Sequence, residues 1–128
     1  MKFLVTGSAG FIGSALCIRL LERGDEVVGI DNLNKYYDPV LKERRLERFK
    51  DNPKYTHIKM DIENEDEVSQ VFSEYSFDGV INLAAQAGVR YSIENPLAYI
   101  RTNILGFTHI LEGCRHSKVN HLVYASSS

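Results

Sequence analysis

The sequence is poor in cysteine and has no long apolar run. Its two cysteines, Cys17 and Cys114, stand far apart and match no metal-ligand spacing. We therefore expect both to be buried small side chains, with no metal site in the chain. No apolar run approaches the ~20 residues that span a bilayer, and the N-terminus lacks the pattern of a signal peptide. These absences predict a cytoplasmic chain that does not cross a membrane.

The chain also lacks a large excess of positively or negatively charged residues. Lys and Arg number 15 and Asp and Glu 17, giving a formal net charge of -2. A chain so close to neutral offers no attraction to nucleic acid or to an anionic membrane surface. The charged segment 42–50 is predicted to be a solvated helix face. Without a repeat or a linker, residues 1–128 are expected to form one domain.

Short apolar runs alternate with helical patterns along the chain. Strands are expected at residues 3–6, 27–30, 55–60, 80–83 and 121–124. Helices are expected at about 11–23, 39–50, 65–75 and 95–116, the third of them capped by Asn64. This alternation predicts an α/β fold with a doubly wound parallel sheet, the Rossmann arrangement, in the strand order 3-2-1-4-5.

A glycine-rich segment lies between the first expected strand and the first expected helix. It reads Thr-Gly-Ser-Ala-Gly-Phe-Ile-Gly over residues 6–13. Gly7 permits a tight turn, Gly10 lets a pyrophosphate approach the backbone, and Gly13 lets the helix pack closely on the strand. The helix N-terminus adds N–H donors and a positive dipole. The segment therefore predicts a dinucleotide-binding loop, with a simple glycine-containing turn as the alternative.

Two acidic residues end the second and third expected strands. The carboxylate of Asp31 can accept both ribose hydroxyls of an adenosine and would repel a 2′-phosphate. No Arg follows within the next few positions, so NAD is preferred over NADP. Asp61 lies at the same edge of the sheet, where it can accept a hydrogen bond from the adenine amino group while Ile62 packs beside the ring. A plain turn at the end of a strand is the alternative for Asp61.

The spacing Gly-x-x-Gly-x-x-Gly resembles the short-chain dehydrogenase/reductase superfamily. The fuller string Thr-Gly-x-x-Gly-Phe-Ile-Gly resembles its extended branch, the nucleotide-sugar epimerases and dehydratases, and further segments agree along the whole chain. The resemblance implies NAD as the cofactor. It implies these cofactor-binding residues: Gly7, Gly10, Phe11, Ile12, Gly13, Asp31, Asn32, Asn34, Asp61, Ile62, Leu83, Ala84, Ala85, Ala87, Asn103 and Ser126.

Two local stretches, residues 34–46 and 85–92, resemble the UDP-glucuronate 4-epimerases. UDP-galactose 4-epimerases commonly have Lys where this chain has Ala87, which disfavours that relative. The resemblance implies that the C4 hydroxyl of a UDP-sugar is oxidised by hydride transfer to NAD and that the hydride then returns to the other face. It assigns the catalytic hydroxyl to Ser127, with an ordinary polar tail as the alternative. Arg90 is expected to bind the sugar carboxylate or the diphosphate, or to be a plain surface residue.

The helix expected from Asn95 carries a second family pattern, Tyr-x-x-x-Asn, at Tyr99 and Asn103. Both side chains are expected to face the sheet. Asn103 is expected to bond the segment beside Ser127. Relatives of this family commonly form homodimers through helices of this domain, so the resemblance also implies a homodimer.

The family's catalytic Tyr-x-x-x-Lys pair is expected beyond the end of this chain. Tyr36, Tyr37, Tyr91 and Tyr99 are not followed four residues later by Lys. We therefore expect a fragment truncated before the sixth strand and the C-terminal substrate domain, binding NAD weakly and without epimerase activity. The alternatives are a fragment of a nucleotide-sugar 4,6-dehydratase or of a UDP-glucuronate decarboxylase, or a non-catalytic dinucleotide sensor.

Overall fold

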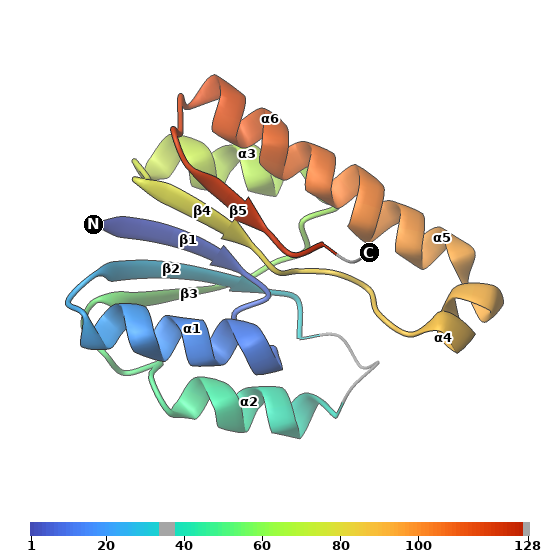
Figure 1. Ribbon diagram of the computed structural model, residues 1–128, viewed down its shortest axis with the longest axis horizontal. Helices are drawn as coiled ribbons and strands as arrows, with labels where there is room; N and C mark the ends of the chain where they lie inside the picture. Colours follow the sequence, from blue (N-terminus) through green and yellow to red (C-terminus); the bar gives the residue numbers. More distant parts are fainter. Residues whose placement is uncertain (34–37, 127–128) are drawn as a thin grey trace.

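A computed structural model describes residues 1–33 and 38–126, in which strands and helices alternate (Figure 1). The strands are β1 (Lys2–Thr6), β2 (Glu26–Asp31), β3 (Tyr55–Lys59), β4 (Gly79–Asn82) and β5 (Leu122–Tyr124). The helices are α1 (Phe11–Glu22), α2 (Pro39–Glu47), α3 (Glu65–Glu74), α4 (Val89–Glu94), α5 (Pro96–Tyr99), the π-helical segment η1 (Ile100–Gly106) and α6 (Phe107–His116). All five strands expected from the sequence are present.

The five strands form one parallel sheet in the order β3-β2-β1-β4-β5. The predicted fold class and strand order are therefore confirmed. The chain moves outward from β1 to β2 and β3, then returns to the other side of β1 for β4 and β5. Such a reversal leaves a crevice at the carboxyl ends of the central strands, and open α/β sheets bind their ligands in that crevice.

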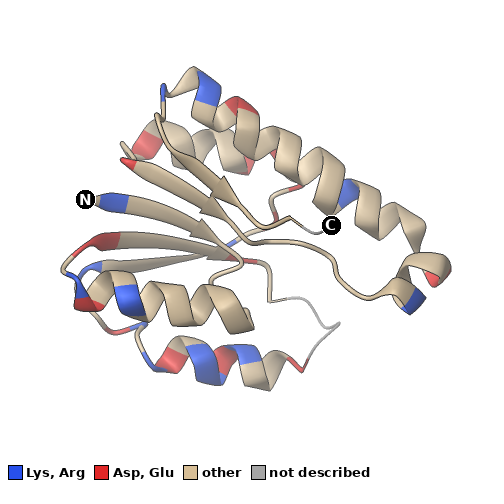
Figure 2. Cartoon of the chain, in the orientation of Figure 1, with Lys and Arg blue, Asp and Glu red and all other residues tan. Residues whose placement is uncertain are grey.

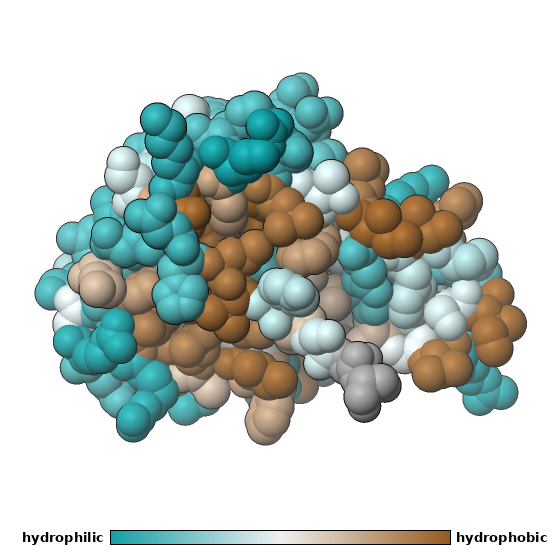
Figure 3. All heavy atoms as spheres, turned by 45° about the horizontal axis from the view of Figure 1, so that its top comes forward, coloured by the Kyte–Doolittle hydropathy of each residue, from teal (hydrophilic) through white to brown (hydrophobic). Residues whose placement is uncertain are grey.

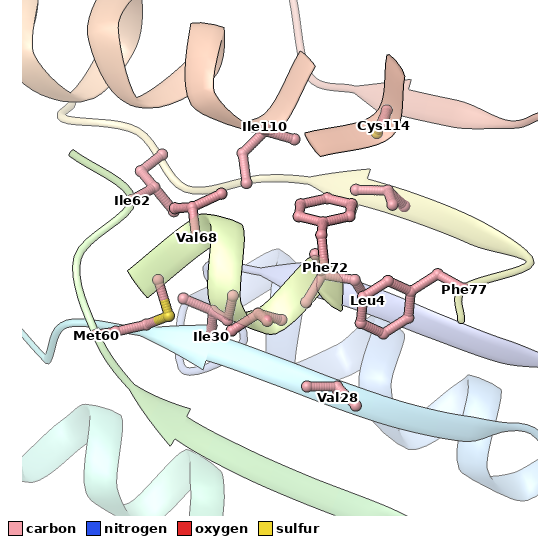
Figure 4. Close-up of a cluster of buried hydrophobic side chains, with 12 residues drawn as sticks. Leu4, Val28, Ile30, Met60, Ile62, Val68, Phe72, Phe77, Ile110 and Cys114 are labelled. Atoms are coloured by element: carbon pink, nitrogen blue, oxygen red, sulfur yellow. The ribbon is translucent and has the colours of Figure 1, made fainter. Parts of the chain in front are cut away.

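Helices cover both faces of the sheet, with α1 and α2 on one side and α3 and α6 on the other (Figure 1). Alternate strand residues therefore face opposite cores. Leu4, Val28 and Val80 face the core under α3 and α6 (Figure 4), whereas Val5 and Val27 face the core under α1. This burial on both faces explains why the strands read as continuous apolar runs.

The two cysteines lie one in each core. Cys17 belongs to the core under α1 and Cys114 to the core under α3 and α6, and both are free and buried. Burial raises the pKa of the Cys17 thiol to about 12. The prediction that both are buried small side chains is confirmed.

Two predicted helices differ from the structure. The helix expected over 39–50 ends at Glu47, because the chain turns there and buries Phe49 edge-on against the ring of Tyr55. The helix expected over 95–116 consists of α5, the π-helical segment η1 and α6, and the short helix α4 precedes it. Apolar spacing does not distinguish a π-helical segment of seven residues from an α-helix.

The predicted cap of α3 is confirmed. The side chain of Asn64 accepts a hydrogen bond from the backbone N–H of Glu67 at 3.0 Å. Three acidic residues, Glu65, Asp66 and Glu67, lie in the first turn, where they interact favourably with the helix dipole. Local sequence signals are thus sufficient to start this helix.

Candidate functional site

A pocket of about 460 Å³ opens at the carboxyl ends of the central strands. Its walls come from the glycine loop, the end of β2 and the segments that follow β3 and β4. The pocket therefore lies in the crevice that the sheet order creates. The structure brings together in its lining these residues expected from the sequence: Gly7, Gly10, Phe11, Ile12, Gly13, Asp31, Asn32, Asp61, Ile62, Leu83, Ala84, Ala85 and Ala87.

The glycine loop has no room for side chains at two positions. Gly7 has a φ of +74°, and a Cβ there would lie 2.9 Å from the backbone nitrogen of Ala84. A Cβ at Gly13 would lie 2.0 Å from the carbonyl oxygen of Gly7. Gly7 thus allows the turn and the contact with the segment after β4, and Gly13 allows α1 to pack on the loop.

Gly10 differs from the other two loop glycines. It is the N-cap residue of α1, its φ is −75°, and no side chain caps the helix there. The first-turn N–H groups of a helix have no partners within the helix. Because Gly10 and the first three residues of α1 line the pocket, these donors and the positive end of the dipole lie at its wall.

Asp31 joins three segments of the chain. One carboxylate oxygen accepts a hydrogen bond from the backbone N–H of Ala9 at 3.1 Å. The other accepts from the N–H of Leu33 at 2.8 Å and from the ammonium of Lys42 at 3.2 Å. Asp31 therefore connects the glycine loop, the segment after β2 and helix α2, and it is only 5% exposed.

Lys42 corrects the prediction for the charged segment 42–50. Most of that segment is exposed, but Lys42 is buried and forms an ion pair with Asp31. The physical reason is helical spacing, since Lys42 precedes the buried Leu46 by one turn and shares its inward face. Arg45 also lines the pocket. The sequence signal for the inward direction of Lys42 was its place one helical turn before the apolar Leu46, and the sequence prediction missed it.

Asp61 forms a strand-end turn and also lines the pocket. Its carboxylate accepts hydrogen bonds from the backbone N–H of Glu63 at 3.0 Å and from the side-chain amide of Asn32 at 3.1 Å. Ile62 is 3% exposed and packs against Gly106, where a Cβ would lie 2.6 Å from Ile62 Cγ1. The turn expected as the alternative is present, and the contact of Asp61 with an adenine stays a prediction.

Two buried polar residues that the sequence prediction missed shape the junction of β1 and β4. The hydroxyl of Thr6 donates to the side-chain oxygen of Asn82 and accepts from the backbone N–H groups of Leu83 and Ala84, both at 3.1 Å. These bonds fix the segment that leaves β4 against the glycine loop. The only sequence signals of this contact were a Thr before the first glycine of the loop and an Asn at the end of β4.

Asn103 holds the same segment farther along. Its side chain accepts from the backbone N–H of Gln86 at 2.9 Å and donates to the carbonyl of Gln86 at 3.0 Å. Tyr99, one turn earlier, donates to the carbonyls of Ala87 and Gly88. In the described part of the chain Asn103 thus bonds Gln86 in the segment after β4, and its expected bond to the segment beside Ser127 stays a prediction.

A second hollow of about 410 Å³ adjoins the pocket and shares Ala84 and Ala85 with it. Asn103 and Ser126 line this hollow rather than the first. Arg90 is exposed on α4 and lines neither of the two, and its contact with a sugar carboxylate or diphosphate stays a prediction. The candidate residues Asn34 and Ser127 lie outside the described residues.

One Tyr-x-x-x-Lys spacing does occur, at Tyr55 and Lys59, beyond the four tyrosines considered above. It lies on β3, where four residues span roughly 13 Å, rather than on one face of a helix. Tyr55 is buried, burial raises its pKa, and its hydroxyl contacts Ser8 and His57. A buried hydroxyl of this kind stays protonated, so Tyr55 does not act as the family's catalytic base. The absence of the catalytic pair from this chain therefore stays a prediction.

Residues 1–33 and 38–126 show neither a cluster of metal ligands nor a membrane-spanning helix. No group of three or more His, Cys, Asp or Glu side chains in these ranges could hold a metal ion. None of their helices is long and apolar enough to cross a membrane. Figure 2 shows Lys and Arg interspersed with Asp and Glu.

Known sequences match the whole chain. The family model described as GDP-mannose 4,6 dehydratase matches residues 4–128. Protein CapI of Staphylococcus aureus is 53% identical over 100% of this chain and 38% of its own length. UDP-glucuronate 4-epimerase 1 of Arabidopsis thaliana is 42% identical over 100% of this chain and 30% of its own length. The chain thus spans well under half of these relatives.

Solved structures agree with the sequence relatives. UDP-glucuronic acid 4-epimerase from Bacillus cereus, in complex with UDP-glucuronic acid and NAD, matches with a TM-score of 0.89 and 38% identity over 100% of this chain and 40% of that chain. UDP-glucose 4-epimerase from Thermus thermophilus, in complex with NAD, matches with a TM-score of 0.84 and 35% identity over 99% and 38%. The expected resemblance to nucleotide-sugar epimerases and dehydratases is confirmed, and the chain belongs to the GDP-mannose 4,6-dehydratase family.

Proposed function

We propose that the chain binds NAD in the pocket at the carboxyl ends of the central strands. The observation that carries the proposal is the pairing, in one pocket, of an uncapped helix N-terminus over glycines with the carboxylate of Asp31. The first can hold a pyrophosphate and the second a ribose hydroxyl. The pocket fits the group, because the glycines leave its phosphate wall free of side chains.

The bonds of Asp31 refine this proposal. A carboxylate has about four acceptor sites, and Asp31 uses three of them within the protein. It therefore accepts one ribose hydroxyl, and the ammonium of Lys42 can donate to the other. Asp61 and Ile62 contact the edge of the adenine. Leu83, Ala84 and Ala85 lie between the adenosine end of the pocket and the hollow that Ser126 lines. When bound, NAD supplies a hydride acceptor.

A calorimetric titration of the 128-residue chain tests the cofactor. We expect one NAD site and about tenfold weaker binding of NADP, equivalent to about 1.4 kcal/mol. The carboxylate of Asp31 repels a 2′-phosphate, but Lys42 and Arg45 limit the discrimination. Gly10→Ala should weaken NAD binding by a similar factor and lower the melting temperature only slightly, because a φ of −75° suits any residue and the added Cβ would lie 3.2 Å from the Gly7 carbonyl oxygen.

Gly24→Ala is the matched control for that titration. Gly24 lies at the far end of α1, with a φ of +94° and nothing near its added Cβ. It should lower stability by about 1 kcal/mol through backbone strain and leave NAD affinity intact. Failure of the unmodified chain to bind millimolar NAD would contradict the proposal.

For the whole protein, we propose a nucleotide-sugar epimerase that acts on UDP-glucuronate at C4. Support comes from relatives and solved structures named as UDP-glucuronate 4-epimerases. The 128-residue chain alone should not convert UDP-glucuronate, because Tyr55 and Lys59 are its only pair at the required spacing and cannot form the catalytic pair. Chromatographic separation of UDP-glucuronate from its 4-epimer after incubation with NAD checks this, and product above the blank would contradict it.

We further propose a homodimer formed through α5, η1 and α6. An apolar stripe runs along these elements at Leu97, Ile100, Ile104 and Leu111, with exposed fractions of 56, 49, 61 and 42%. Figure 3 shows apolar surface at the end of the molecule that carries α4 and α5. Ile104→Asp should shift sedimentation from dimer to monomer, whereas Val40→Asp on α2 should not. A wild-type chain that stays monomeric at high concentration would contradict the dimer.

A further inference from the structure

Ser8, in the glycine loop, has a partner that the proposed NAD contacts do not explain. Its side chain is fully buried. The hydroxyl of Tyr55 donates to Ser8 Oγ at 3.3 Å, and Nδ1 of His57 lies 3.0 Å from the same Tyr55 oxygen. Tyr55 belongs to β3, and β2 lies between that strand and β1, which leads into the loop. A side chain from the edge of the sheet thus reaches the loop that follows its centre.

Gly29 makes this contact possible. It lies in the middle of β2, paired with His57 of β3. A Cβ at Gly29 would lie 2.2 Å from the hydroxyl oxygen of Tyr55 and 2.8 Å from Ser8 Oγ. A glycine inside a strand often marks a place where another group approaches closely. Here the missing side chain leaves the space in which Tyr55 passes across β2.

The Tyr55 hydroxyl donates to Ser8 when Nδ1 of His57 carries the imidazole proton and itself donates to the Tyr55 oxygen. Its ring packs edge-on against Phe49, with the centroids 4.7 Å apart. Burial raises the pKa of Tyr55, so the hydroxyl keeps its proton. On either side of Ser8, the backbone N–H of Gly7 bonds Ile30 and that of Ala9 bonds Asp31. The backbone N–H of Ser8 also donates to the Ile30 carbonyl at 3.2 Å, so the loop is fixed through its backbone at residues 7–9 and, in addition, through the side chain of Ser8.

We propose that Tyr55 is a positioning residue for the phosphate loop. Its hydroxyl, passing over Gly29, fixes Ser8 and with it the backbone of residues 7–10, on which the pyrophosphate of NAD would lie. The inference rests on the proposed function, because it assumes that this loop binds the pyrophosphate. Tyr55 itself does not line the pocket.

Tyr55→Phe in the 128-residue chain tests the inference, with NAD, ADP and adenosine titrated separately. One hydrogen bond corresponds to about a 3- to 10-fold change in affinity. We expect a loss of this size for NAD and ADP and none for adenosine, which has no phosphate. Ser8→Ala should reproduce the pattern. The double variant should bind no more weakly than either single variant, since both remove the same bond.

Phe49→Leu is the control for a purely structural role of Tyr55. It removes the edge-on packing of the Tyr55 ring and keeps the hydroxyl, so it should lower the melting temperature without changing NAD affinity. An equal loss for adenosine, an equal loss in Phe49→Leu, or additive losses in the double variant would overturn the inference. If Tyr55→Phe does not fold, Ser8→Ala decides, and unchanged NAD affinity overturns it. A wild-type chain that does not bind NAD instead overturns the proposed function.

Discussion

Asp31→Ala is expected to weaken NAD binding about 10- to 100-fold, the value of a hydrogen bond to a charged group. The same change should lower the free energy of unfolding by about 3 kcal/mol, because it leaves a buried charge without its partner. That charge is the ammonium of Lys42, and the backbone N–H groups of Ala9 and Leu33 lose their acceptor as well. Calorimetry with NAD and urea unfolding of the free chain measure the two effects.

The double variant Asp31→Ala/Lys42→Met separates binding from folding. Removing the ammonium together with the carboxylate leaves no unpaired charge, so much of the lost stability should return. NAD affinity should stay low, because the ribose acceptor Asp31 and the proposed ribose donor Lys42 are both missing. If affinity returned together with stability, Asp31 would hold the fold and would not be the ribose ligand.

Gly13→Ala is expected to remove both stability and NAD binding. The added Cβ would lie 2.0 Å from the carbonyl oxygen and 2.8 Å from the carbonyl carbon of Gly7, so α1 must move away from the loop. Backbone displacement of this kind costs about 3 kcal/mol. Urea unfolding should show this loss, and calorimetry should show no saturable NAD binding.

Gly10→Ala is the contrast for Gly13→Ala. Both glycines line the pocket, but a Cβ at Gly13 would lie 2.0 Å from the Gly7 carbonyl oxygen, whereas a Cβ at Gly10 would lie 3.2 Å from the same oxygen, a tight contact that a small backbone shift relieves. Gly10→Ala should therefore reduce binding with only a small loss of stability. Equal unfolding free energies for Gly13→Ala and the wild type would contradict the close packing of α1 on the loop.

The sheet order and the glycine loop could be predicted because their signals are local. Strands buried on both faces appear in the sequence as apolar runs. Because helices alternate with these strands and parallel crossovers are right-handed, only a few strand orders are possible. Gly7 has a positive φ, and the atom that a Cβ at Gly13 would meet, the carbonyl oxygen of Gly7, belongs to the same loop. Both features are therefore readable without knowing which distant residues meet.

The partners of the site residues could not be predicted in the same way. Lys42 stands in a run of charges, and only its place one turn before Leu46 turns it inward to Asp31. Gly29 and Tyr55 look like ordinary strand residues until the register brings them beside Ser8. These contacts depend on side-chain direction and on the packing of distant segments, which composition and periodicity do not contain.

The most direct test of NAD binding in this pocket is an NMR titration of the ¹⁵N-labelled chain with NAD. We expect saturable amide shifts at Gly7, Gly10, Gly13, Asp31 and Ala84, all of which line the pocket. The amides of α3, on the opposite side of the sheet from α1 and α2, should stay in place. Shifts centred on α3 and α6, or no saturable shift in the glycine loop, would contradict it.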